Sequence, residues 1–253
     1  MNASSRPVLG ASLLVVLPLL GVGIARARGY AEREISMPAL GERGQLTVVM
    51  HRDGGQAIAG RDDPRRLRSG GVARQGLDWV DVPAFAGDDA QWQQLVACVQ
   101  DQYAGVAITI TDQAPARGDF ILAFVGGTPD IFGFDEVVHG ISPWSGRVIG
   151  NAVVFAFQSP DTSDRRLCEI AAHEIGHALG LDHSRDCTDT MSYESCGEKY
   201  FREEAAPCGE WDDRSCGSGK GTQSSAAELA RRVGRDDEVF AKGPLSFDFV
   251  DAM

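Results

Sequence analysis

The feature that most constrains this chain is the run from His173 to His183, which holds three of its five histidines. The run reads His-Glu-Ile-Gly-His-Ala-Leu-Gly-Leu-Asp-His. Side chains four residues apart lie on one face of an α-helix, so a helix would bring His173 and His177 to the same ion. Gly180 can adopt the left-handed conformation that ends a helix, and the turn would return His183 to that ion. The run therefore predicts a helix, a glycine turn and a metal site.

Three imidazoles are a typical ligand set of a catalytic zinc ion, which keeps one coordination position open. Glu174 follows the first ligand and can lie beside that position, where a carboxylate takes a proton from the water that zinc activates. Zinc also polarises a scissile carbonyl and stabilises the oxyanion that forms. We therefore predict a hydrolytic site with one Zn²⁺ on His173, His177 and His183, and with Glu174 as the general base.

The N-terminal residues have the pattern of a secretory signal. Arg6 precedes an apolar run from Val8 to Ala25, and Ala25-Arg26-Ala27 offers small residues at the spacing that signal peptidase prefers. An uncleaved membrane anchor is the alternative, but a proline and two glycines interrupt the run. We interpret residues 1–27 as a signal peptide and 28–43 as a short N-terminal segment. This predicts a secreted protein, extracellular or periplasmic, with no membrane attachment after cleavage.

The cysteine count and the net charge indicate which bonds and partners this protein can have. Six cysteines follow the signal segment, and an even number in an exported chain predicts disulfides. Six cysteines allow 15 pairings, and the sequence does not choose among them. The absence of any Cys-x-x-Cys pair argues against zinc held by cysteine. The net charge of −12 argues against a nucleic-acid partner, because phosphate binding needs clustered basic residues. We expect a monomer.

Hydrophobic periodicity predicts an α+β domain over residues 44–235, with a mixed sheet, two long helices and a C-terminal helix. Strands are expected at 46–50, 106–110, 120–125 and 152–157, with an edge strand at 134–141. Helices are expected from Asp88 or Asp89 to Tyr103, from Ser163 or Asp164 through the histidine run, and from Ser224 or Ser225 to Val233. Residues 52–76 and 184–222 are expected to be loops, the first with a solvated basic surface. The tail, 236–253, carries four large apolar residues and is expected to dock partly.

The histidine run resembles the zinc motif of the metzincin metallopeptidases, in which a methionine turn follows the third histidine. Thr190-Met191-Ser192-Tyr193 is the candidate Met-turn here. The segment from His177 to Ser184 is similar to the matrixins, of the bacterial type, whereas Met-Ser-Tyr is similar to the serralysins. The resemblance implies a twisted mixed sheet beside a zinc cleft, with Met191 beneath the metal. It also implies a zinc metalloendopeptidase that hydrolyses peptide bonds in protein or peptide substrates.

Other roles rest on the same resemblance. In serralysins and astacins a tyrosine two positions after the methionine ligates zinc or stabilises the oxyanion, which implies a catalytic role for Tyr193. An extended substrate would pair with the edge strand near residues 139–144. Trp211 and Tyr200 lie in the loop that lines the pocket beside the scissile bond, so they could shape specificity. A catalytically inactive, secreted zinc-binding pseudopeptidase is the alternative to an enzyme.

This sequence also departs from the family pattern. No Pro-Arg-Cys-Gly segment precedes the domain, so we do not expect latency through a cysteine switch. Only one histidine, His139, lies where matrixins often bind a second zinc ion, so we expect a single zinc. Asp130, Asp135 and Glu136 could hold Ca²⁺, although a solvated acidic loop is the favoured interpretation.

Overall fold

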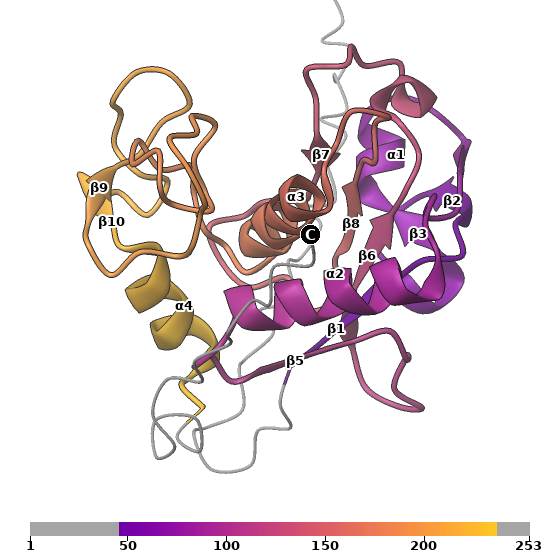
Figure 1. The fold of residues 1–253 in the computed structure, drawn as a ribbon, viewed down its shortest axis with the longest axis horizontal. Coiled ribbons are helices and arrows are strands. Elements are labelled where there is room, and N and C mark those ends of the chain that lie inside the picture. The colour runs from indigo at the N-terminus through magenta and orange to yellow at the C-terminus, as the bar shows by residue number, and fades with distance from the viewer. Residues whose placement is uncertain (1–45, 237–253) are drawn as a thin grey trace, which may run out of the picture. The chain divides into compact units, whose positions relative to one another are not determined.

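A five-stranded mixed sheet organises the part of the chain that the computed structural model describes, residues 46–236. Its strand order is β5-β1-β6-β8-β7 (Figure 1). The strands are β1 (Leu46–His51), β5 (Ile108–Thr111), β6 (Phe120–Val125), β7 (Gly140–Ile141) and β8 (Val153–Ala156). All neighbours are parallel except β7, which pairs antiparallel with β8 at the edge. The predicted α+β class with a mixed sheet is confirmed. The signal segment and most of the tail lie outside the described residues.

Three helices begin where the sequence predicted them, because each has a side-chain cap. They are α2 (Asp89–Gln102), α3 (Asp164–Ala178) and α4 (Ser225–Val233). Asp88 caps α2 in a capping box with Gln91, and Ser163 and Ser224 cap the other two. Figure 1 shows α2 crossing in front of the sheet beside α3, the helix that carries two of the histidines. The long helices therefore form a layer on one face of the sheet.

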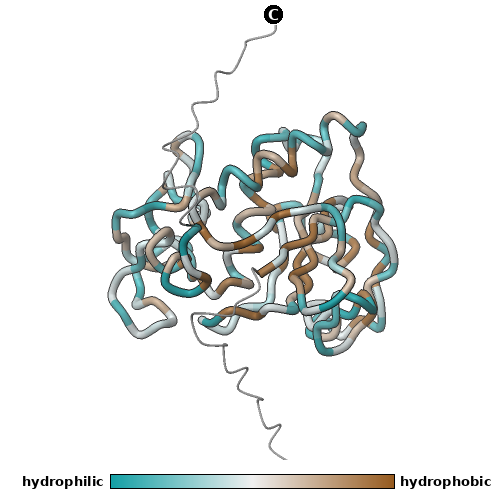
Figure 2. Tube along the Cα trace, turned by 90° about the horizontal axis from the view of Figure 1, so that it is seen from below, coloured by the Kyte–Doolittle hydropathy of each residue, from teal (hydrophilic) through white to brown (hydrophobic). Residues whose placement is uncertain are grey.

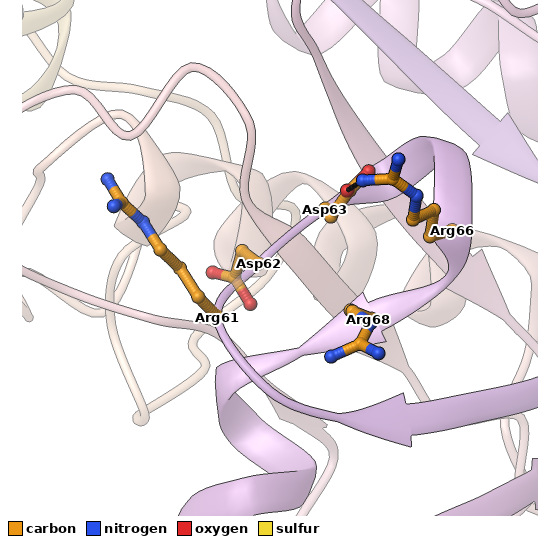
Figure 3. Close-up of a pocket in the computed structure, with 5 residues that line it drawn as sticks. All are labelled: Arg61, Asp62, Asp63, Arg66 and Arg68. Carbon is orange, nitrogen blue, oxygen red and sulfur yellow. Dashed lines mark hydrogen bonds and ion pairs between the residues drawn. The ribbon is translucent and has the colours of Figure 1, made fainter.

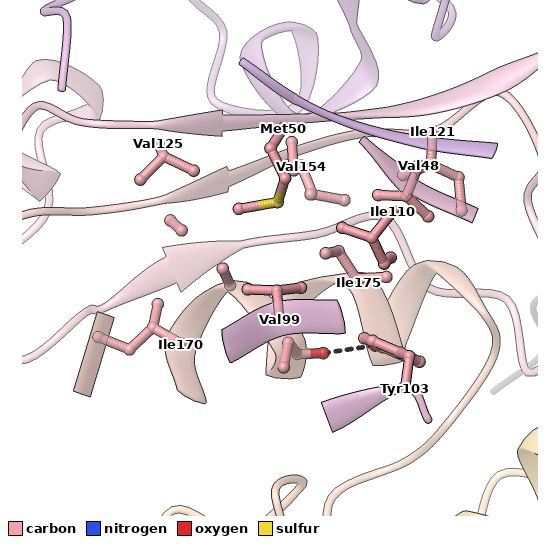
Figure 4. Close-up of a cluster of buried hydrophobic side chains, with 14 of the residues drawn as sticks. Val48, Met50, Val99, Tyr103, Ile110, Ile121, Val125, Val154, Ile170 and Ile175 are labelled. Carbon is pink, nitrogen blue, oxygen red and sulfur yellow. Dashed lines mark hydrogen bonds between the residues drawn. The ribbon is translucent and has the colours of Figure 1, made fainter. Parts of the chain in front are cut away.

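The central strands are apolar throughout because both faces of the sheet are covered. In β6, Ile121 and Ala123 point to a core shared with α2 and α3, whereas Leu122 and Phe124 point to a second core on the other face. Figure 4 shows residues of the first core, where the Tyr103 hydroxyl also donates to the Ala172 carbonyl at 2.7 Å. Figure 2 shows the hydrophobic segments gathered inside the described part of the chain. Strand alternation thus builds two cores from one sheet.

The prediction of a loop over residues 52–76 is wrong, because a small second sheet lies there. Its strands are β2 (Gly55–Ala59), β3 (Arg68–Ser69) and β4 (Trp79–Val82). The short helix η1 (Pro64–Arg66) joins β2 to β3, and α1 (Gly70–Arg74) joins β3 to β4. The elements are only two to five residues long, so hydrophobic periodicity has too few residues to show them. Ala57, Val72 and Val82 supply its buried side chains to the second core.

The arginines of this region surround a surface pocket of about 320 Å³ (Figure 3). The pocket is lined by Arg61, Asp62, Asp63, Arg66 and Arg68. Its charges are mixed, and Arg66 donates to the Asp63 carboxylate at 3.0 Å. Because all three arginines are exposed to solvent, the pocket fits the solvated basic surface that the sequence predicted.

The edge strand and the long loop differ in detail from prediction. The edge strand shrinks from residues 134–141 to Gly140–Ile141, because the 3-10 helix η2 (Pro129–Phe132) ends at Gly133 in a left-handed conformation and a turn follows. The 184–222 loop holds only a short pair of strands, β9 (Ala206–Pro207) and β10 (Thr222–Gln223). All six cysteines form disulfides, which are Cys98–Cys168, Cys187–Cys196 and Cys208–Cys216.

Candidate active site

Helix α3 and the turn after it bring the three predicted histidines together. His173 and His177 lie one turn apart near the end of α3, and the chain then returns His183 to them. One ligand atom from each of the three histidines lies within 4.8 Å of the others, and the Nε2 atoms of His177 and His183 are 2.9 Å apart. The three histidines therefore lie close enough to share one ion, as their spacing in the sequence predicts.

A Schellman turn at Gly180 makes this return possible. Gly180 has φ +90°, and the N–H groups of Gly180 and Leu181 donate to the carbonyls of His177 and Gly176 at 2.8 and 2.9 Å. This bonding satisfies carbonyls that the helix end leaves free. A Cβ added at Gly180 would lie 2.8 Å from the backbone nitrogen of Arg147. Both the conformation and the packing at this position therefore require glycine.

Gly180→Ala is expected to lower the free energy of unfolding by about 2–4 kcal/mol. The alanine would have to adopt a left-handed backbone conformation, and its Cβ would crowd the backbone of Arg147. Gly133→Ala is the control, since Gly133 has φ +76° but nothing lies within 4 Å of an added Cβ. That variant should lose only about 1 kcal/mol, the cost of the backbone conformation. Urea denaturation of both variants measures the difference. Equal losses would show that contact with Arg147 adds nothing.

The donor set fits zinc, because each imidazole is held by its other nitrogen. Nδ1 of His173 lies 2.8 Å from the Thr190 carbonyl, and Nδ1 of His177 lies 2.9 Å from the Leu181 carbonyl. Nδ1 of His183 lies 2.7 Å from the Glu210 carboxylate. Each partner can only accept, so Nδ1 carries the proton and Nε2 offers its lone pair to a metal. Burial, followed by the neighbouring histidines, lowers the pKa of His173 and brings that of His177 to about 3, which favours the neutral ligand form.

The fourth predicted group, Glu174, lies next to the first ligand on α3 and is buried. Burial raises the pKa of its carboxyl to about 8. The side chain lies against β7, since a Cβ added at Gly140 would be 2.5 Å from its Cγ and Oε1. The carboxyl therefore lies beside the edge strand of the sheet.

Gly140→Ala is expected to lower peptide cleavage by about 10²-fold, because a displacement of about 1 Å of a reacting group can cost that much. The zinc content should stay at the wild-type value, since the three atoms nearest to a Cβ added at Gly140 all belong to Glu174 and none to a histidine. Cleavage kinetics and metal analysis of the purified variant test this. Full activity would show that the Glu174 carboxyl does not depend on the space at Gly140.

The residues of the candidate Met-turn lie next to the histidines. Met191 is fully buried, and a Cβ added at Gly176 would meet its Sδ at 2.6 Å, so the methionine packs under α3. The Tyr193 ring is 46% exposed and lies 4.4 Å from that of His183, between centroids. Burial and the charges of Glu174 and Glu210 raise the pKa of the Tyr193 phenol, so it stays protonated and can donate a hydrogen bond.

The two aromatic residues that were expected to shape specificity, Trp211 and Tyr200, lie in different places in the structure. Trp211 is 66% exposed, and its ring lies 5.8 Å from that of Tyr193, beside the histidines. Tyr200 instead lies over the guanidinium of Arg165, at 4.8 Å, near the start of α3. Only Trp211 is therefore placed to contact a ligand at the histidine site.

The suggested calcium ligands gain no support. Asp130, Asp135 and Glu136 are exposed, and Asp130 accepts a hydrogen bond from Thr128. Within residues 46–236, the groups of side chains close enough to share a metal ion do not include these three. They fit the solvated acidic loop that the sequence favoured.

Sequence reasoning missed Glu210, the partner of His183. Hydrogen bonds from Arg214 and His183 hold the pKa of its carboxyl at about 2. Glu210 is 27 residues from His183 in sequence, and no motif links the two. Its only sequence signal is its place between Cys208 and Cys216, which form a disulfide in the structure.

A mixed sheet beside a helix with the extended histidine motif is the arrangement typical of the metzincin metallopeptidases. Residues 90–203 match the family model of the matrixins. The chain is 26% identical to interstitial collagenase B of Mus musculus over 162 residues, which cover 52% of this chain and 35% of the collagenase. It is 37% identical to interstitial collagenase of Oryctolagus cuniculus over 87 residues, which cover 31% and 18%. The chain therefore resembles the matrixins over the matched residues, and it spans about a third or less of the length of these relatives.

Proposed function

We propose that this chain is a secreted zinc-dependent endopeptidase with His173, His177 and His183 as the metal ligands and Glu174 as the general base. The observation that carries the proposal is the orientation of the imidazoles. All three use Nδ1 for a hydrogen bond to an acceptor, so their Nε2 lone pairs are free for one ion. The buried Glu174 carboxyl lies on the same helix, next to the first ligand.

When bound, zinc activates a water molecule and polarises the scissile carbonyl. The Glu174 carboxylate takes a proton from the attacking water and returns it to the leaving amine, and the burial that raises its pKa makes it a stronger base. The phenol of Tyr193, which is the tyrosine of the proposed Met-turn, donates a hydrogen bond to the developing oxyanion. Strand β7 is the edge strand beside Glu174, so an extended peptide pairing with it would bring a peptide bond to the carboxyl.

Export is supported by the disulfides, which form and persist in oxidising compartments. Between residues 46 and 236, no helix is long and apolar enough to cross a membrane. We propose that residues 1–27 are a cleaved signal peptide, that 44–235 are the catalytic domain, and that the domain acts as a monomer on protein or peptide substrates.

The proposal is tested by digestion of casein and gelatin with the purified mature chain. We expect one zinc ion per chain by metal analysis, digestion that a chelator abolishes, and recovery when zinc is added back. A peptide library should then give a cleavage profile from the same preparation. One bound zinc without cleavage of any protein or library peptide would contradict the enzyme and support a zinc-bearing binding protein.

A further inference from the structure

We propose that Glu210 is the positioning residue for His183, and that the segment Cys208–Cys216 thereby sets the zinc affinity of the site. The inference rests on the proposed zinc site. In the proposed site Glu210 does not touch the metal, because it accepts from Nδ1 of His183 and leaves Nε2 of that ring to the metal. Its effect on the metal passes through the imidazole ring.

The partner of His183 differs in charge from those of the other two ligands. His173 and His177 donate to neutral backbone carbonyls, which the Met-turn and the helix end fix in place. His183 donates to a carboxylate at 2.7 Å. A charge-assisted bond of this kind is about twice as strong as a neutral one, and it raises the basicity of the ring as a ligand. The third ligand, which lies beyond the end of the helix, therefore has the strongest external support.

Arg214 fixes the position of the Glu210 carboxylate. Its guanidinium donates to Oε1 of Glu210 at 2.8 Å and to Oε2 at 3.3 Å. Two further bonds of 2.8 Å join it to both carboxylate oxygens of Asp182. Asp182 also accepts from the backbone N–H of His183 at 2.8 Å. One arginine thus links the carboxylate that orients the His183 ring to the carboxylate that holds the His183 backbone.

The disulfide and backbone bonds fasten this arrangement to the site. The Cys208–Cys216 bond closes the segment that carries both Glu210 and Arg214. The N–H of Gly209 donates to the His183 carbonyl at 3.2 Å, and Arg185 donates to the Glu210 carbonyl at 3.2 Å. A Cβ added at Gly217 would meet the Trp144 ring at 2.1 Å, so the end of the segment also packs on the loop after β7. The segment is therefore held at His183 and, through the neighbouring Gly217, against Trp144.

The test measures zinc binding by Glu210→Gln and Glu210→Ala, with Asp213→Asn as the matched control. Asp213 lies in the same disulfide-closed segment and pairs with Arg185 at 3.4 Å, whereas the carboxylate that bonds His183 is that of Glu210. Loss of such an exposed ion pair should change affinity by no more than about twofold. Zinc dissociation constants come from competition with a chromophoric chelator, and the melting temperatures of the metal-free proteins show whether each variant is folded.

We expect zinc to bind about 10–100-fold more weakly to Glu210→Ala. Glu210→Gln should fall between that variant and the wild type, because its amide oxygen can still accept from Nδ1. The absorption bands of the Co²⁺-loaded protein should also shift in both Glu210 variants, since the ligand strength of His183 changes, and stay unchanged in Asp213→Asn. A purely structural role for Glu210 would not move these bands.

Zinc affinities of both Glu210 variants within about twofold of the control would overturn the inference, since loss of such a partner typically costs 10-fold or more. This outcome is distinct from failure of the proposed function. If the wild type itself binds no zinc, then the three-histidine site is wrong and not merely its support by Glu210.

Discussion

Glu174→Gln is expected to lower kcat/KM for peptide cleavage by about 10²–10⁴-fold, the usual contribution of a general base. Glutamine has nearly the same size but cannot take a proton from water. Zinc content should stay at the wild-type level, because the proposed metal ligands are the three histidines and the substitution leaves all three in place. The fold should also persist, since the amide removes a carboxyl that burial penalises when it is charged. Steady-state kinetics with a fluorogenic peptide and metal analysis measure both quantities.

Glu194→Gln is the matched control for this variant. Glu194 is also a carboxylate in the region of the site, but it pairs with Arg185 at 2.7 Å and is partly exposed. Its loss should change activity by no more than about twofold, as for other exposed ion pairs. Equal activity in the two variants would remove Glu174 from the mechanism, whatever the metal content. Loss of zinc in Glu174→Gln would instead show that the carboxyl supports the ligands.

The sequence predicted the elements whose signal lies in local spacing. The histidines at 173, 177 and 183 required a helix and a glycine turn, and α3 and Gly180 have that geometry. Strand β6 was predicted over its full length, because both of its faces are buried and the apolar run is continuous. Caps such as Asp88 and Ser163 also lie next to the helices that they begin. In each case the residues that decide the structure are close together in the chain.

The features that the sequence did not predict depend on contacts between distant segments. The small sheet at β2, β3 and β4 gains its order from packing on the main sheet, which elements of two to five residues do not show alone. Glu210 reaches His183 only because the Cys208–Cys216 segment folds back over the site. The pairing of the cysteines follows from that same folding, so counting cysteines could not supply it.

The disulfide that joins α2 to α3 should be the most important for stability. Cys98 and Cys168 are 70 residues apart, whereas Cys187 and Cys196 are 9 apart. In the chain-entropy model the longer loop contributes about 4 kcal/mol to the free energy of unfolding, against about 3 kcal/mol for the shorter one. Because Cys168 is fully buried, its loss also leaves a cavity under the helix that carries His173. The Cys98→Ala/Cys168→Ala double variant should therefore lose more stability than Cys187→Ala/Cys196→Ala.

Guanidinium denaturation of the two double variants, with the other disulfides intact, measures this difference directly. Peptide mapping under non-reducing conditions checks that the remaining cysteines keep their pairing. If they formed other disulfides, the stability loss could not be assigned to the one disulfide that was removed. A smaller loss in the Cys98→Ala/Cys168→Ala variant would contradict both the loop-length argument and the cavity argument. A larger loss in the Cys98→Ala/Cys168→Ala variant, in contrast, means that the disulfide to α2 stabilises α3 in addition to its packing on the sheet. Zinc affinity should then fall with this variant when denaturant begins to loosen α3.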